Sequence, residues 1–167
     1  MPRKLFLLFL AIMGANRRTK FFKSIHYFHK QGKNCYFQPF NFGTEPYLIS
    51  FGDNVKVASN VHFINHDIIP FVFNDINQSE LPTRVGKINI GDNVFIGSES
   101  TILYDVNIGN NVVIGSGSIV TKDIPDNSVA VGIPCRVVGS FDDCKDKYLK
   151  IISNYTWSQN DKNKKQK

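Results

Sequence analysis

Residues 88–124 read INIGDNVFIGSESTILYDVNIGNNVVIGSGSIVTKDI, and an aliphatic side chain returns at every sixth position of this stretch. The repeated aliphatics are Ile90, Ile96, Ile102, Ile108, Ile114 and Val120. A second series follows four residues after each of them, at Val94, Ser100, Val106, Val112, Ser118 and Ile124. A period of six matches neither the turn of an α-helix nor the alternation of a plain strand. It is typical of a hexapeptide repeat that winds into a β-helix.

The physical basis of this interpretation is the way such repeats stack. Each hexapeptide supplies one short strand and one turn, so three of them make one triangular coil. One β-branched side chain per repeat points inward and stacks on its equivalents in neighbouring coils, which buries a continuous apolar column. Glycine and asparagine recur at the corners, where a positive φ costs other residues energy. The sequence therefore predicts an all-β solenoid, a parallel β-helix of hexapeptide repeats.

The repeat also defines the domain boundaries. Phe51, Val57 and Phe63 are spaced by six as well, but this series does not continue in phase into the one that begins at Ile90. We therefore expect one β-helical domain over residues 32–139, interrupted by a polar, irregular loop at 66–87 that protrudes from a corner. A loop of about twenty residues inside a regular solenoid suggests a functional role.

Short extensions flank this domain. Residues 1–31 are predicted to be a helical segment, with helix-like apolar spacing over 21–30. Residues 140–167 are predicted to begin with a helix that caps the open end of the coil through Tyr148, Leu149 and Ile152. The lysine-rich tail from residue 160 onward is expected to be disordered.

Charge is distributed unevenly along the chain. The net charge is +6, but residues 1–44 hold eight Lys or Arg and no acid, whereas residues 45–161 hold eight basic and fourteen acidic side chains. The repeat body is thus mildly acidic, which argues against a nucleic-acid-binding body. Three cysteines without CxxC spacing indicate neither disulfides nor a zinc knuckle, so we expect a reducing cytoplasm.

The first twenty residues allow three interpretations. Arg3 and Lys4 precede an apolar run over residues 5–13, and Arg17 and Arg18 follow it. The run is too short to span a bilayer. It is either a helix packed on the body or on another subunit, or an interfacial anchor in which residues 1–20 meet anionic lipid, or the core of a cleaved signal peptide.

Three motifs go beyond architecture. Residues 114–125 (IGSGSIVTKDIP) and 132–137 (GIPCRV), together with 93–98 (NVFIGS), resemble the hexapeptide-repeat O-acetyltransferases. Within these they are most similar to the galactoside and maltose acetyltransferase branch and its capsular-polysaccharide relatives. The resemblance covers residues 32–139. It implies a left-handed β-helix and a homotrimer with active sites between neighbouring subunits. It also implies acetyl-CoA as the donor substrate, with no metal.

Acetyl transfer to a hydroxyl needs a base, and histidine is the usual choice because it titrates near neutral pH. His26 and His29 lie outside the coils, and His62 is expected to face outward from a regular repeat. His66 stands where the repeat breaks, the place that the base occupies in the resembling family. We predict His66 as the general base, with His62 as the alternative. A carboxylate or a backbone carbonyl should orient its ring, and adjacency alone does not place the Asp67 side chain there.

The remaining site residues follow from the resemblance and from their position in irregular segments. Carry-over onto matching positions predicts contacts with the donor by Ser98, Ser116, Thr121, Lys122 and Arg136, the last two as cations for the CoA phosphates. Asn65, Asp67 and Glu45 are predicted to contact the acceptor. The sequence around Cys135 offers no partner that would activate its thiol, so we expect direct transfer in a ternary complex.

The predicted function is O-acetylation of a sugar or polysaccharide precursor by a cytoplasmic enzyme, with the inner face of the membrane as a further place of contact. N-acetylation of an amino sugar and O-acetylation of serine are alternatives. A metal-dependent carbonic anhydrase on the same coil needs three imidazoles, and the body holds only His62 and His66. A non-catalytic trimeric scaffold would not need the intact Thr121, Lys122 and Arg136.

Overall fold

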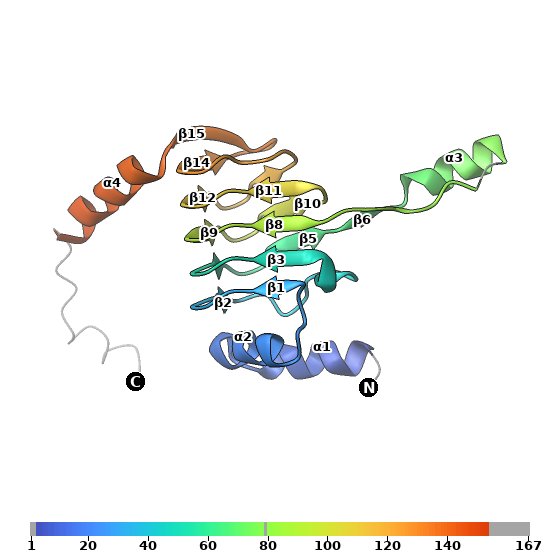
Figure 1. The fold of residues 1–167 in the computed structure, drawn as a ribbon, viewed down its shortest axis with the longest axis horizontal. Helices are drawn as coiled ribbons and strands as arrows, with labels where there is room; N and C mark the ends of the chain where they lie inside the picture. The colour runs from blue at the N-terminus through green and yellow to red at the C-terminus, as the bar shows by residue number, and fades with distance from the viewer. Residues whose placement is uncertain (1–2, 79, 154–167) are drawn as a thin grey trace, which may run out of the picture.

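The computed structural model describes residues 3–78 and 80–153, which form a column of stacked three-sided coils (Figure 1). Three sheets run along the column, and their strands are parallel except for β15. The first sheet contains β1 (Lys30–Gln31), β3 (Ile49–Phe51), β8 (Ile88–Ile90) and β11 (Val106–Ile108). The second contains β5 (His62–Ile64), β10 (Thr101–Leu103) and β13 (Ile119–Val120). The third contains β2 (Tyr36–Phe37), β4 (Lys56–Val57), β9 (Val94–Ile96), β12 (Val112–Ile114), β14 (Ser128–Val131) and β15 (Arg136–Ser140). The predicted parallel β-helix is confirmed.

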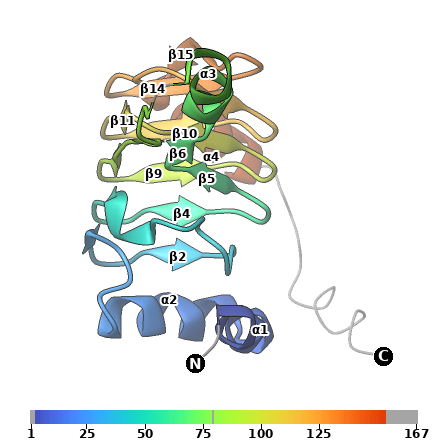
Figure 2. The same cartoon turned by 90° about the vertical axis from the view of Figure 1, so that its right-hand side faces the viewer.

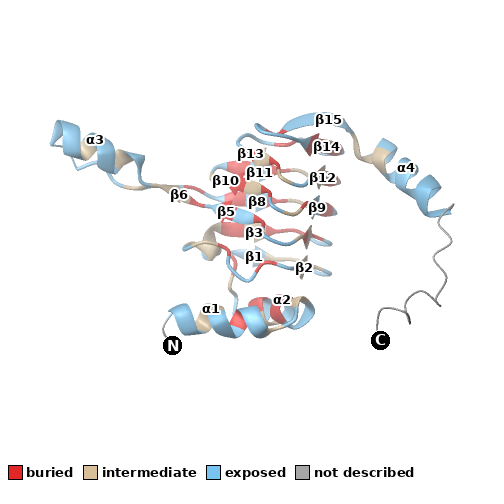
Figure 3. Cartoon of the chain, turned by 180° about the vertical axis from the view of Figure 1, so that it is seen from behind, coloured by how far each residue is buried: buried red, intermediate tan, exposed pale blue. Residues whose placement is uncertain are grey.

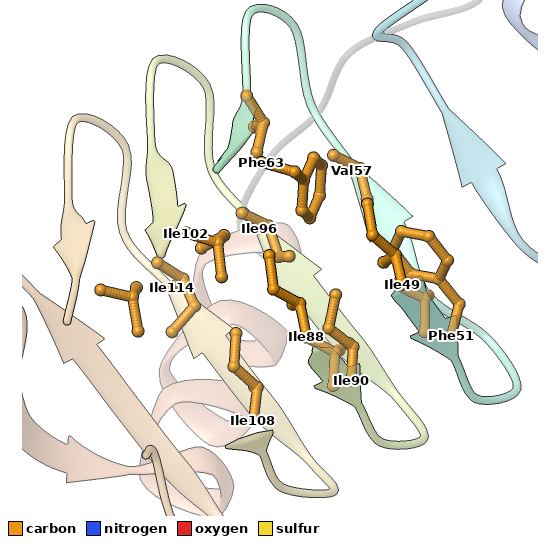
Figure 4. Packing of buried hydrophobic residues seen from close by; sticks show 14 of the residues in the cluster. Ile49, Phe51, Val57, Phe63, Ile88, Ile90, Ile96, Ile102, Ile108 and Ile114 are labelled. Carbon is orange, nitrogen blue, oxygen red and sulfur yellow. The ribbon is translucent and has the colours of Figure 1, made fainter. Parts of the chain in front are cut away.

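Both predicted series of repeated residues lie inside the column. The six residues from Ile90 to Val120 and the six from Val94 to Ile124 are each at most 4% exposed, and Figure 4 shows aliphatic side chains stacked from coil to coil. Burial of one such aliphatic side chain stabilises a fold by about 1.5–3 kcal/mol, so this interior is the main source of stability. Ser100 and Ser118 are the polar members, and both hydroxyls donate to the Gly115 carbonyl, at 3.1 and 2.6 Å.

The corner between the first and third sheets repeats from coil to coil, and we call it the corner ladder. Its Asp or Asn accepts a backbone N–H of the preceding coil, as in the 2.7 Å bond from Asp53 N to Asp92 Oδ1 and the 2.8 Å bond from Asp92 N to Asn110 Oδ1. The next residue is an asparagine with a φ of 55° to 59°, and these side chains bond to one another at 2.8–3.0 Å. The four asparagines are Asn54, Asn93, Asn111 and Asn127.

Glycine is required where the coils approach most closely. A Cβ at Gly52, the residue before Asp53 in the corner ladder, would lie 2.2 Å from Asp92 Oδ1 and 2.6 Å from the Gly91 carbonyl oxygen. A side chain there would force neighbouring coils apart.

Two helices close the N-terminal end of the column. α1 (Arg3–Ile12) and α2 (Ala15–Ser24) lie across it (Figures 1 and 2). The buried aromatic rings of Phe22, Phe28 and Phe42 pack against one another next to these helices. The chain is therefore helical over 15–24, not over 21–30. His26 adopts a φ of 50°, a left-handed conformation in which an α-helix does not continue.

A buried arginine fastens these helices to the first coil. Arg18 is 5% exposed and donates to the carbonyl oxygens of Pro39 at 3.1 Å, Leu10 at 3.0 Å and Met13 at 2.6 Å, and also to that of Gln38. This geometry favours the interpretation of the apolar N-terminal run as a helix packed on the body. Among the residues the structure describes, no helix is both long and apolar enough to cross a bilayer.

The expected protruding loop leaves the column between β5 and β8, but it is not irregular. It consists of β6 (His66–Asp67), α3 (Ile69–Asn77) and β7 (Arg84–Val85), and we call it the arm (Figures 1 and 2). β6 and β7 pair antiparallel. Arg84 Nη2 lies 3.1 Å from Asp105 Oδ2, and its guanidinium lies 4.8 Å from the centre of the Tyr104 ring. These contacts fix the root of the arm to the next coil.

The C-terminal helix is present but does not cap the coil. α4 (Phe141–Ser153) extends away from the column (Figure 3), and the side chains of Tyr148, Leu149 and Ile152 are more than half exposed. The end of the column is instead formed by β15, which folds back antiparallel on β14. The predicted disordered tail from residue 160 lies outside the described residues.

The corner ladder makes a stability prediction at Asn93. Replacement by alanine removes its bonds to Asn54 and Asn111, and alanine tolerates the left-handed φ of 56° less well than asparagine, so we expect Asn93→Ala to lower the free energy of unfolding by about 1–3 kcal/mol. Asn93→Gly loses the same bonds without the steric penalty and should be less destabilising. Chemical denaturation of both variants tests this, and equal losses would contradict the conformational part.

Candidate functional site

His66 is the first residue of β6, where the chain leaves the column for the arm. Its Nδ1 lies 2.8 Å from Glu45 Oε2 and 3.4 Å from Thr44 Oγ1. The Thr44 hydroxyl donates to the same Glu45 oxygen at 2.7 Å. Both partners precede the short 3-10 helix η1 (Pro46–Leu48), one coil before His66. A histidine, a carboxylate and a hydroxyl thus meet at the root of the arm.

This contact determines what the imidazole can do. With the carboxylate as acceptor, Nδ1 carries the proton and Nε2 keeps its lone pair. Nε2 makes no hydrogen bond with residues 3–78 or 80–153, and 37% of the His66 side chain is exposed. An imidazole oriented in this way can accept a proton from a substrate hydroxyl, and the carboxylate then stabilises the imidazolium.

Glu45 is held in its charged form. Burial alone would raise the pKa of this carboxyl, but the hydrogen bonds from Thr44 and His66, together with the charges of His66 and Arg3, outweigh it and lower the pKa of Glu45 below its ordinary value. The Arg3 guanidinium is close because it donates to the Gly43 carbonyl at 3.2 Å. The carboxylate is therefore available as an acceptor over a wide pH range.

The three residues predicted to contact an acceptor have separate environments. Glu45 binds His66. Asp67 accepts a hydrogen bond from the Tyr104 hydroxyl and belongs to the root of the arm. Asn65 is 1% exposed, and its Nδ2 donates to the Gly86 carbonyl at 3.2 Å, so its burial argues against direct contact with an acceptor.

His62, the alternative base, points outward from the second sheet as predicted. It lies opposite Thr101 in the strand register, and it lines a cavity of about 400 Å³ together with Gln38 and Phe40. No hydrogen bond links His62 to another side chain among the described residues. The ring therefore lacks the orienting carboxylate that His66 has.

The residues predicted to bind the donor lie along both edges of the second sheet. Ser98 and Ser116 occupy the corner before it on neighbouring coils, which touch closely because Gly117 N donates to the Ser98 carbonyl at 2.8 Å. Thr121 and Lys122 lie at the opposite edge, the same edge as His66 and two coils further on, roughly 10 Å along the column. The strands of the second sheet thus separate Ser98 and Ser116 from Thr121 and Lys122.

Cys135 lies next to β13, the last strand of the second sheet, and Arg136 is the first residue of β15 in the third sheet. Cys135 N donates to the Ile119 carbonyl at 2.8 Å, and the exposed Arg136 donates from Nη1 to the Cys135 carbonyl at 2.8 Å. Burial raises the pKa of the Cys135 thiol, so the thiolate needed for a covalent intermediate is disfavoured. Within the described ranges, no three His, Cys, Asp or Glu side chains cluster closely enough to hold a metal ion.

Sequence reasoning missed three elements of this arrangement. It left the partner of His66 open and did not predict Thr44 beside it, nor the contacts of Tyr104 and Arg84 at the root of the arm. One signal was present for Glu45. It precedes His66 by 21 residues, close to the 18 that separate equivalent corner positions such as Asp92 and Asn110.

Comparisons with known proteins agree with the fold. The family model "Bacterial transferase hexapeptide (six repeats)" matches residues 87–122. Protein CapG of Staphylococcus aureus is 42% identical over 139 residues, which cover 80% of this chain and 78% of CapG. Several further curated relatives are galactoside or putative acetyltransferases by name, and the chain spans 49% to 56% of their lengths.

Two solved structures are similar over most of their length. A maltose O-acetyltransferase from Clostridium difficile 630 is 31% identical, with a TM-score of 0.61 and coverage of 82% of this chain and 83% of that one. A galactoside acetyltransferase in complex with coenzyme A is 28% identical, also with a TM-score of 0.61, and coverage is 93% and 84%.

The lowered pKa of Glu45 makes a prediction about acid stability. A carboxyl whose pKa falls on folding contributes stability above its unfolded pKa and loses that contribution as the pH falls through the folded value. Glu45→Gln should therefore unfold at a lower temperature than wild type at neutral pH, and the difference should shrink below about pH 4. Asp142→Asn, on the exposed start of α4, is the control. A difference that stays constant with pH would contradict the charged contact.

Proposed function

The chain belongs to the hexapeptide-repeat acetyltransferase family, and on this premise we propose that it transfers the acetyl group of acetyl-CoA to a hydroxyl of a sugar or polysaccharide precursor. The observation that carries the proposal is the His66 imidazole, oriented by Glu45 and with Nε2 free of hydrogen bonds from the described residues. The names of two relatives, a galactoside and a maltose acetyltransferase, support a sugar as the acceptor.

The proposed reaction is a direct transfer in a ternary complex. His66 Nε2 removes the proton of the acceptor hydroxyl while its oxygen attacks the thioester carbonyl carbon. The tetrahedral intermediate collapses, the carbon–sulfur bond breaks, and the imidazolium donates the proton to the CoA thiolate. Glu45 holds the ring in one tautomer and stabilises its charge between these steps. No covalent enzyme intermediate is needed, which agrees with the buried, unactivated Cys135.

The residues along the second sheet fit the donor. CoA is long and carries phosphates at one end, and the chain offers exposed cations at Lys122 and Arg136 and hydroxyls at Ser98, Ser116 and Thr121. Charge-assisted hydrogen bonds to phosphate would come from the cations, and the hydroxyls would bond the amide groups of the pantetheine arm. The solved galactoside acetyltransferase with bound coenzyme A supports this assignment of the donor.

The proposal includes a left-handed winding and a homotrimer with active sites between subunits. Two observations support the trimer. The predicted donor residues line opposite edges of one sheet, so facing edges of two subunits would complete a cleft. The arm also leaves the side chains of Phe71, Val72 and Ile76 more than half exposed, a surface that a neighbouring subunit would cover. We propose a cytoplasmic enzyme.

The test of this function is the comparison of two histidines. CoA release should be measured with acetyl-CoA and a panel of galactosides, maltose, amino sugars and serine. We expect His66→Ala to lower kcat by about 10²–10⁴-fold with little change in KM for acetyl-CoA, because the ring acts on the acceptor. His62→Ala is the matched control and should retain most of the activity. Full activity in His66→Ala would disprove the proposed base, and acetylation of serine or an amino sugar alone would favour the alternatives.

A further inference from the structure

The outer side of the two N-terminal helices forms one exposed surface, which we call the basal face. In α1, Leu10 is buried against the column, and Leu5, Leu8 and Ile12 lie on the opposite side of the helix, where they are 53%, 61% and 77% exposed. Phe9 flanks them at 41%. An apolar stripe on a helix that is already packed on its other side is not needed for the fold.

The neighbouring helix carries only positive charge on its outer side. Arg18, Thr19 and Phe22 of α2 face the column, which leaves Arg17 and Lys20 pointing away from it. Both helices lie across the same end of the column, so their outer sides form one surface (Figures 1 and 2). Lys4 adds a further exposed cation, and residues 1–44 contain no acidic side chain.

An apolar stripe beside a row of cations restricts the kind of partner. A second copy docked through the same face would bring two sets of cations together, which is repulsive. A nucleic acid would bind the cations but would leave the leucine and isoleucine side chains without an apolar partner. An anionic lipid surface satisfies both parts, because its headgroups attract Lys and Arg while the acyl boundary accepts apolar side chains.

We propose that the basal face docks on the surface of an anionic lipid bilayer, with α1 lying in the plane of the interface. At ten residues α1 is only about 15 Å long, half the hydrocarbon thickness, so it lies on the membrane and does not span it. Arg18 and its four carbonyl acceptors hold both helices to the coil, so the whole column stands on the bilayer in one orientation.

Docking at this face also specifies the acceptor, and this part rests on the proposed function. His66 lies on the second coil, which places it roughly 15–20 Å above the basal face. Arg3, at the start of α1, donates to the Gly43 carbonyl, two residues before Glu45. The catalytic residues therefore stand within reach of a glycan that is linked to a lipid headgroup, and the acceptor class is a lipid-linked saccharide.

Flotation of the full-length protein with vesicles tests the docking. The vesicles contain phosphatidylcholine with about 30% phosphatidylglycerol, or phosphatidylcholine alone. We expect binding to the anionic vesicles that weakens at about 0.5 M salt. Two double variants of the basal face should each reduce vesicle binding about tenfold or more without loss of folded structure. One removes apolar side chains (Leu8→Gln/Ile12→Gln), and the other removes cations (Arg17→Gln/Lys20→Gln).

Matched controls lie on α4, whose exposed residues allow the same chemical changes. Leu149→Gln/Ile152→Gln and Lys145→Gln/Lys150→Gln should bind vesicles like wild type. The sequence ends in further lysines, which could also bind anionic vesicles. Vesicle binding that persists in both basal-face variants would therefore overturn the proposal. If the basal-face variants dissociate an oligomer that wild type forms without lipid, the proposal is also overturned, because the face would then be a contact between copies of the chain.

The activity assay separates this inference from the proposed function. Vesicle binding without CoA release for any acceptor would leave docking intact and disprove the enzymatic proposal. CoA release with soluble sugars but no vesicle binding would support the enzymatic proposal and disprove the docking. If a short saccharide linked to a vesicle lipid is no better an acceptor than the free saccharide, the lipid-linked acceptor class is wrong.

Discussion

Backbone amides at one corner of the column set how each coil sits on the next. In the corner ladder the side-chain oxygen of one coil accepts the N–H of the preceding coil, and the following asparagine takes a left-handed φ. These bonds join equivalent positions, so a coil displaced by one residue would lose them and would also turn its inward aliphatics toward solvent. The aliphatic interior and the edges of the second sheet are therefore positioned by the same constraint.

Much of the fold could be predicted because every coil presents the same environment to the same repeat position. That logic ends where the environment is no longer repeated. The helix in the arm was missed because Phe71, Val72 and Ile76 contact no core in the single chain, and their spacing is not constrained by the column. The second N-terminal helix was misplaced along the sequence because tertiary contacts of Arg18 and Phe22, not local periodicity, determine where α2 lies.

The candidate site divides along the same line. His66 could be named as the candidate base because it stands where the period breaks, and the candidate donor residues could be named from the resemblance of whole motifs. Glu45 was seen, but as an acceptor contact. Its carboxylate reaches the imidazole from a segment that follows no repeat, and the distance between them depends on the turn before η1. The placement of the predicted donor residues on two edges of one sheet likewise depends on how the coils stack, which the sequence motifs do not show.

The antiparallel return of β15 has a consequence beyond closing the last coil. A stack of parallel strands has two open ends, each a template on which another chain could add strands indefinitely, as in a fibre. At one end of the third sheet β15 pairs with β14 in the opposite direction, which interrupts the parallel order there. At the other end the helices bound through Arg18 cover the first coil. The parallel repeat, which would otherwise be easy to extend, is thus interrupted in the third sheet at one end and covered by helices at the other.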